Sequence, residues 1–345
     1  MESSEVSWFW KEDIWLPPNV TWKDLEPRPD KPYANFYHLY LPIPFGIILI
    51  IIRTLLEWFA FKPFGTSLGL RARRVRKIPA NSILEKAAAR NHIMDRKQIQ
   101  GLAKQVDMSE RQVERWLRNY QLQRKPNKLT KFCETGWRCL VYIVMFVYGI
   151  WVIWDKPWTW DIMECWRGFP MHCYDSEEMM ESLQFISPDV WWYYMLELSF
   201  YWSLMFSQFF DIQRKDFWQM FMHHCATICL LSFSWACNYT RIGTLVLACH
   251  DCADIFLDGA KMAKYAGRTR VCNLLFGIFT FLWIVTRLGI FPFKIIYSTC
   301  WEATTLYPVF PAYYIFNSLL MALLLLHVFW TYWILRSALK ALAGH

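Results

Sequence analysis

The chain has 345 residues, of which 55% are hydrophobic and 19% aromatic, with 21 tryptophans and a formal net charge of +8. Its length alone would allow two or three soluble domains, but this aromatic and apolar content excludes an ordinary soluble protein. An apolar run of about 18 or more residues predicts a membrane-spanning helix. Seven such windows occur, near residues 41–61, 137–154, 189–210, 217–236, 241–260, 272–293 and 308–335. We therefore expect an all-α polytopic membrane protein with about seven transmembrane helices.

The N-terminal segment, residues 1–40, has neither a basic start nor a smooth apolar core, so no cleavable signal peptide is expected. The first window, 41–61, should then stay in the protein as a membrane anchor. A glycosylation sequon begins at Asn19, ahead of this window. A second sequon, at Asn238, is squeezed between two windows, and we expect it to be out of reach.

Charge indicates the orientation of the chain in its membrane. Residues 62–138 contain 19 Lys and Arg against 6 Asp and Glu, a net charge of +13. Residues 155–188 contain 2 Lys and Arg against 7 Asp and Glu, a net charge of −5. Basic segments prefer the cytoplasmic side. We therefore expect a lumenal N-terminus, and we place residues 336–345, a short tail, in the cytoplasm.

Residues 66–128 are predicted to form a small cytoplasmic insert. Asp95 with Gln98, and Ser109 with Gln112, are two capping boxes, and apolar residues at helical spacing follow each of them. A helix-turn-helix, preceded by a further helix over "NSILEKAAAR", is the predicted structure.

The segment "RQVERWLRNYQLQRKP" in this insert resembles the third helix of a homeodomain. Asn119 falls where that family has its base-reading asparagine. Tyr120 and Gln121 stand where the family has arginines, so two phosphate-binding charges are missing. We therefore expect a basic helical module on the membrane-facing surface, and DNA binding is unlikely.

The fifth window carries five ionisable side chains on one side of its helix. At 100° per residue they fall within an arc about 100° wide. An unpaired Asp at mid-membrane costs roughly 2.5–3.5 kcal/mol, so we expect this face to border a protein-lined cavity. The five are His250, Asp251, Asp254, Asp258 and Lys261.

The fourth window carries two adjacent histidines, His223 and His224. The fourth and fifth windows are antiparallel neighbours, which brings these imidazoles to a depth similar to that of His250 and Asp254. Ionisable groups that converge inside a membrane favour a functional site over simple packing.

Two readings of the other ionisable residues stay open. A metal site is the rival interpretation, but it would need further histidines, and His38, His92, His172, His327 and His345 are expected to lie outside the cluster. Glu197 and Arg287, in other windows, are as well explained as structural partners. Cys165 and Cys173 share the acidic segment and could form a disulfide in an oxidising compartment.

Residues 210–266, from "FDIQRKDFWQMFMHH" to "HDCADIFLDGAKMAKYA", resemble the Lag1 motif of ceramide synthases, inside a TRAM-Lag1-CLN8 (TLC) domain that we place at residues 131–335. "WFWKEDIWLPPNVTW" and "LELSFYWSLMFSQ" are similar to other parts of this family, and the degenerate homeobox-like segment is typical of its animal members. The sequence ends at "LAGH" without the acidic, serine-rich tail usual in the family, which puts phosphorylation-based regulation in doubt.

The resemblance implies an endoplasmic reticulum enzyme that joins a fatty acyl-CoA to a sphingoid base, with no metal or organic cofactor. A homo- or hetero-dimer among membrane lipids is expected. His223 and His224 are assigned as base and acyl acceptor in an undecided order, with Asp251 and Asp254 as orienting or amine-binding groups and His250 as a third partner. A non-catalytic lipid-binding or lipid-sensing TLC protein is the alternative.

Acyl-chain length is expected to be limited at the lumenal loop between the sixth and seventh windows, residues 298–314. Bulky side chains there would close the acyl slot: Trp301, Tyr307 and Phe310. Neither the preferred length nor the oligomeric state follows from the sequence.

Overall fold

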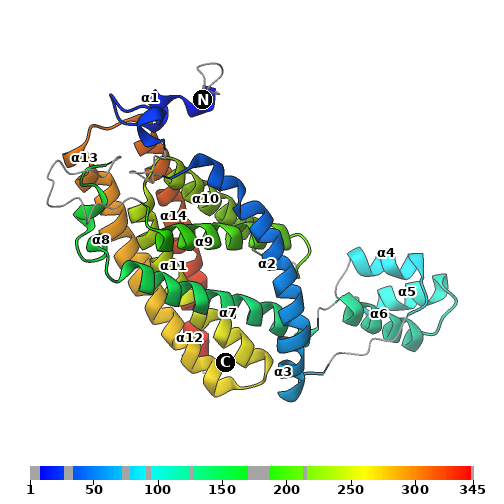
Figure 1. The fold of residues 1–345 in the computed structure, drawn as a ribbon. Coiled ribbons are helices and arrows are strands. Elements are labelled where there is room, and N and C mark those ends of the chain that lie inside the picture. The colour runs from blue at the N-terminus through cyan, green and yellow to red at the C-terminus, as the bar shows by residue number, and fades with distance from the viewer. Residues whose placement is uncertain are drawn as a thin grey trace.

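The computed structural model describes residues 8–26, 34–71, 78–90, 95–124, 127–169, 186–212 and 216–342. Every regular element in these ranges is helical (Figure 1), which confirms the all-α fold. Within the described residues, four helices are long and apolar enough to cross a membrane, and their ranges are Phe36–Ser67, Lys128–Ile153, Thr269–Leu306 and Pro311–Lys340. The chain is thus a multi-pass membrane protein, whereas the count of seven spans stays a prediction.

The main bundle contains long helices in this order: α2 (Pro42–Leu56), continued by η4 (Glu57–Phe61) and α3 (Lys62–Ser67); α7 (Lys128–Ile153); α9 (Pro188–Ser207); α10 (Phe217–Ala236); α11 (Thr240–Tyr265); α12 (Thr269–Trp283), continued by η7 (Ile284–Ile296); and α14 (Pro311–Leu342). Short elements join or precede them: η1 (Trp8–Trp10), α1 (Glu12–Trp15), η2 (Trp22–Leu25), η3 (Phe36–Tyr40), α8 (Pro157–Trp160), η5 (Ile162–Cys165), η8 (Ser298–Glu302) and α13 (Ala303–Leu306).

Helix α11 lies at the centre of the bundle, in contact with α7, α12, η7, α9 and α10. Small residues let its neighbours approach closely. A Cβ atom added to Gly243 would lie 1.5 Å from the hydroxyl of Tyr194 on α9, and that hydroxyl is hydrogen-bonded to Ser234 of α10 at 2.8 Å. Helices α9, α10 and α11 therefore pack closely at Gly243.

The predicted connection between the sixth and seventh windows is mostly helical, which corrects the expectation of a loop over 298–314. Residues 269–306 form one uninterrupted helical segment, and only residues 307–310 separate it from α14. Its middle part, η7, is a wide π-helix that contains Pro292. No proline lies between Pro292 and Pro308, so nothing in the sequence interrupts the helix before Tyr307.

Three short helices form a separate unit beside the bundle (Figure 1): α4 (Ser82–Arg90), α5 (Arg96–Gln105) and α6 (Glu110–Arg124). Both predicted capping boxes are present, since Gln98 accepts from the backbone N–H of Asp95 at 3.2 Å and Gln112 from that of Ser109 at 2.8 Å. The helices share a hydrophobic core formed by Leu84, Ala88, Ala103, Val113, Trp116 and Leu117. The likeness to a homeodomain remains a prediction.

We call the end of the bundle that carries α8, η5, η8 and α13 the α13 end. Helix α1 packs there against α14 (Figure 1). Asn19 is exposed, whereas Asn238 is buried, as expected of an inaccessible sequon. Cys165 is also buried, and the disulfide proposed for it lies outside the described residues because Cys173 does.

Candidate active site

His224 lies on α10 in a defined hydrogen-bonded setting. Its Nδ1 is 3.0 Å from Oε1 of Gln208, and the amide nitrogen of Gln208 donates to the carbonyl of Phe217 at 2.7 Å. Because Oε1 of Gln208 can only accept, Nδ1 of His224 carries the proton in this arrangement. Nε2 of the neutral ring is then an unprotonated base.

His223, the preceding residue, is half-buried, and its ring lies 5.7 Å from that of His224. The edge of Trp330 on α14 packs against the His223 imidazole, with ring centroids 5.5 Å apart. Its Nδ1 is buried without a hydrogen-bond partner among the described residues. A buried polar atom without a partner is costly, so this ring is available to a ligand.

His250 on α11 has the same tautomeric preference as His224. Its Nδ1 lies 2.7 Å from the backbone carbonyl of Val246, which can only accept, so Nδ1 carries the proton. Its Nε2 is buried and has no partner in the described part of the chain. A second unprotonated imidazole nitrogen is therefore held in place.

Asp254, one turn further along α11, pairs with Arg287 of η7 at 2.9 Å. The Arg287 guanidinium also donates to the backbone carbonyl of His250 and lies 4.9 Å from the ring of Trp283. A second guanidinium nitrogen of Arg287, Nη1, is 3.4 Å from Nε2 of His327. This buried cation ties the ionisable face of α11 to the next two helices.

His327 corrects the sequence-based expectation, which placed it outside the cluster. Its ring is fully buried on α14, 5.0 Å from the ring of His250. The helical pattern of α14 gave no sign of this contact, because the partners lie 40 and 77 residues earlier in the chain. Arg287, for which a structural role was left open, contacts the same groups.

Asp251 and Glu197 form a second buried group. Both are almost fully inaccessible to solvent, Glu197 on α9 and Asp251 on α11. Both carboxyl oxygens of Glu197 and Oδ2 of Asp251 are buried without a hydrogen-bond partner among the described residues. Asp258 differs from both, because it forms ion pairs with Arg138 at 3.2 Å and with Lys261 at 2.8 Å.

A cavity of about 360 Å³ brings most of these groups together, and we call it the polar cavity because of the ionisable residues that line it. Its lining includes His223, His224, His250, Asp254, Asp258, Lys261, Arg138 and Arg287. Asp251 is not among the lining residues, so its carboxyl group does not border the cavity. The cavity also reaches residues near the end of the bundle opposite the α13 end, such as Asp216 and Ser337.

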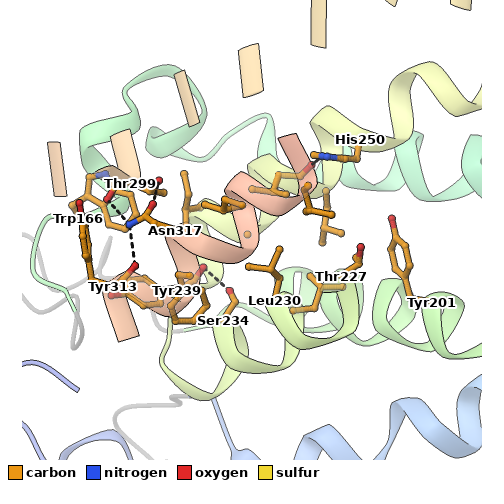
Figure 2. A pocket seen from close by; sticks show the side chains of 18 of the residues that line it. Trp166, Tyr201, Thr227, Leu230, Ser234, Tyr239, His250, Thr299, Tyr313 and Asn317 are labelled. Carbon is orange, nitrogen blue, oxygen red and sulfur yellow. Dashed lines mark hydrogen bonds between the residues drawn. The ribbon is translucent and has the colours of Figure 1, made fainter. Parts of the chain in front are cut away.

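An apolar pocket begins where the polar cavity ends, because Tyr201 and His250 line both. Figure 2 shows His250 and Tyr201 at one side of this pocket and Trp166, Tyr313 and Asn317 at the other. A polar chamber that opens into an apolar pocket suits a ligand with a charged head and an alkyl tail.

The three residues expected to limit acyl length are placed differently from one another. Tyr307 lines the apolar pocket. Trp301 is 61% exposed and stacks on Tyr297 with ring centroids 5.6 Å apart, so it does not face the pocket. Phe310 is buried in the core but is not among the lining residues. Of the three expected residues, only Tyr307 therefore lines the apolar pocket.

Among the residues the structure describes, no three His, Cys, Asp or Glu side chains are arranged to hold a metal ion. Catalysis without a metal or organic cofactor remains a prediction.

Comparisons with known proteins identify the class to which this protein belongs. The TLC domain family matches residues 131–336, so this is a TLC-domain membrane protein. Human ceramide synthase 3 is 44% identical over 295 residues, which cover 85% of this chain and 73% of that protein. Human ceramide synthase 5 is 42% identical over 298 residues, with 86% and 73% covered. Ceramide synthase hyl-1 of Caenorhabditis elegans is 34% identical over 302 residues, with 87% and 68% covered. The chain belongs to the ceramide synthase family.

Proposed function

We propose that this protein is a sphingoid base N-acyltransferase that uses the buried His/Asp cluster to form an amide from an acyl-CoA thioester and a long-chain amine. Family membership supports the reaction. The single observation that carries the site is the junction at His250 and Tyr201, where the polar cavity with its histidines meets the apolar pocket. A thioester at this junction would have its reacting carbonyl among the imidazoles and its alkyl tail in the apolar pocket.

The reaction needs a base because a sphingoid base is an ammonium ion near neutral pH and cannot attack before it loses a proton. Nε2 of His224 or of His250 would accept that proton, since each ring holds its own proton on Nδ1. The amine nitrogen then forms the C–N bond, the C–S bond breaks, and the departing CoA sulfur takes up a proton. The net products are one amide and one CoA thiol.

A two-step route remains compatible with the same residues. In that route an unprotonated imidazole nitrogen attacks the thioester, CoA leaves, and the amine takes the acyl group from the imidazole. Nδ1 of His223 has no protein partner among the described residues. The assignment of base and acyl acceptor between His223 and His224 therefore stays open.

The polar groups around the histidines would position them and bind the amine. Arg287 holds Asp254 and the carbonyl of His250, so it fixes the ionisable face of α11. Asp254 keeps a quarter of its side chain exposed, and that exposed part lies on the polar cavity, where an ammonium group could approach it. We regard Arg287 as a positioning residue and Asp254 as the candidate amine-binding residue.

We also propose that the chain lies in the endoplasmic reticulum membrane with seven spans, a lumenal α13 end and a cytoplasmic insert. The net charges of +13 over 62–138 and −5 over 155–188 support this orientation. The polar cavity would then open toward the cytoplasm, where acyl-CoA is found. Helices α9 and α10, of 20 residues each, are about 30 Å long, which matches the thickness of the hydrocarbon core.

The deciding experiment measures CoA release by the detergent-purified full chain, with an acyl-CoA and sphinganine, and with each substrate omitted in turn. We expect release that requires sphinganine, together with formation of the amide. A protein that bound both substrates and released no CoA would be the lipid-binding alternative.

A further inference from the structure

The apolar pocket follows one face of each of three helices. Its lining residues recur every three or four positions on α10 (Thr227, Leu230, Leu231, Ser234), on α11 (Ile242, Gly243, Val246, Leu247, His250) and on α14 (Tyr313, Phe316, Asn317, Leu320, Leu323). Residues at this spacing lie on one helix face. The pocket therefore runs lengthwise between the three helices, from the site histidines toward the α13 end (Figure 2).

Positions along helix α14 give the distance from the site histidines to the far side of this pocket. His327 lies beside His250, with ring centroids 5.0 Å apart, and Tyr313 lines the far side of the pocket. The two residues are fourteen positions apart on one continuous helix, so the far side of the pocket lies about 21 Å from the level of the site histidines at about 1.5 Å per residue. An extended alkyl chain gains about 1.3 Å per carbon, so about 16 carbons reach from the site histidines to the far side of the pocket.

An aromatic wall, which we define as Trp166, Phe169, Tyr239 and Tyr307, lies at the α13 end of the pocket. Phe169 stacks on Tyr239 with centroids 4.3 Å apart and lies 5.0 Å from Tyr307. Trp166 is 6.1 Å from Tyr239 and 6.3 Å from Tyr307. Trp166, Tyr239 and Tyr307 line the pocket directly, and Phe169 supports them from behind.

The wall draws on three separate parts of the chain. Trp166 and Phe169 follow η5, Tyr239 joins α10 to α11, and Tyr307 follows α13. Trp166 is 2% exposed and donates to the hydroxyl of Ser298 at 2.7 Å, which ties the residues after η5 to η8. Trp166 and Tyr239, which lie outside the 298–314 segment, thus form part of the surface that an acyl terminus would meet.

We propose that the aromatic wall sets the acyl specificity of this enzyme, and that the wild-type chain prefers acyl groups of about 16 to 18 carbons. The inference rests on the proposed function, since it assigns the apolar pocket to the acyl tail. It moves the length limit from the exposed Trp301 to Trp166, whose ring faces the pocket.

The test compares the length of the amide products of the full chain in detergent, with an equimolar panel of saturated acyl-CoAs of about 14 to 26 carbons. The wild type should peak at about 16 to 18 carbons and fall by about tenfold or more at about 22. Trp166→Ala should move the peak upward by at least about two carbons, because the pocket gains room beyond its present end. Trp301→Ala is the matched control and should leave the profile unchanged.

A second variant keeps the test decisive if Trp166→Ala does not fold. Tyr307→Leu shortens the wall at a half-buried position, and the same upward shift is expected. A wild-type peak at about 22 carbons or longer, or unchanged profiles in folded, active wall variants, would overturn the inference and leave the acyltransferase function intact. A wild-type chain that formed no amide with any acyl-CoA would overturn both.

Discussion

Removal of the Arg287 guanidinium would leave the Asp254 carboxylate in the bundle without its cation. In the structure the two groups are 2.9 Å apart, with the Arg287 side chain 3% exposed and that of Asp254 25% exposed. Breaking a buried ion pair by deleting one partner costs about 3–5 kcal/mol. Because a quarter of Asp254 can still be hydrated, we expect Arg287→Met to destabilise the protein by about 3 kcal/mol, at the lower end of that range.

A double-mutant cycle separates the pair from the general effect of each substitution. Unfolding free energies would be measured in detergent for Arg287→Met, Asp254→Asn and the double variant. We expect a coupling energy of about 1–3 kcal/mol, so that Asp254→Asn recovers part of what Arg287→Met loses. Arg336→Met, at an exposed arginine on α14, is the control and should stay within about 0.5 kcal/mol of wild type. Additive single effects would refute the pairing.

Two further predictions concern packing and orientation. Gly243→Ala should destabilise the protein by about 1–3 kcal/mol in the same unfolding assay, because the new methyl group meets the Tyr194 hydroxyl at 1.5 Å, whereas Gly277→Ala, with nothing within 4 Å, should not destabilise it. Asn19 should carry a glycan and Asn238 none, so endoglycosidase should shift the wild-type band and leave Asn19→Gln unmoved; a glycan acquired at a sequon engineered near residue 100 would invert the proposed orientation.

Local patterns in the sequence were sufficient for the helices and for part of the site. The capping boxes at Asp95 and Ser109 depend on residues three positions apart, so they could be predicted and the structure confirms them. The ionisable face of α11 follows from helical periodicity alone. That His224, His250 and Asp254 border one cavity follows from the antiparallel neighbours α10 and α11.

The remaining contacts depend on packing between distant segments. The ring of His327 meets that of His250 across 77 residues, and Arg287 reaches Asp254 across 33. Neither contact has a periodic signature, because each depends on how two separate helices are rotated against each other. The position of Trp166 at the end of the apolar pocket likewise requires the fold of residues 155–169.

The sequence alone could not tell which of Trp301 and Tyr307 lies at the apolar pocket. Trp301 and Tyr307 both belong to a segment that was expected to be a loop, and in a loop either could reach the pocket. The segment is helical to Leu306, which leaves Trp301 exposed and only Tyr307 on the pocket side. Because the segment is helical up to Leu306, the direction of each side chain is fixed by its position around the helix.

Amide formation by a variant without the two adjacent histidines tests the central claim most directly. The full chain with His223→Ala and His224→Ala would be compared with wild type and with His38→Gln, a histidine that bonds Trp191 away from the cavity. Thermal unfolding would first establish that all three proteins are folded. The account predicts a loss of at least about a hundredfold in the double variant and near-normal turnover in His38→Gln. Turnover close to wild type in a folded double variant would contradict it.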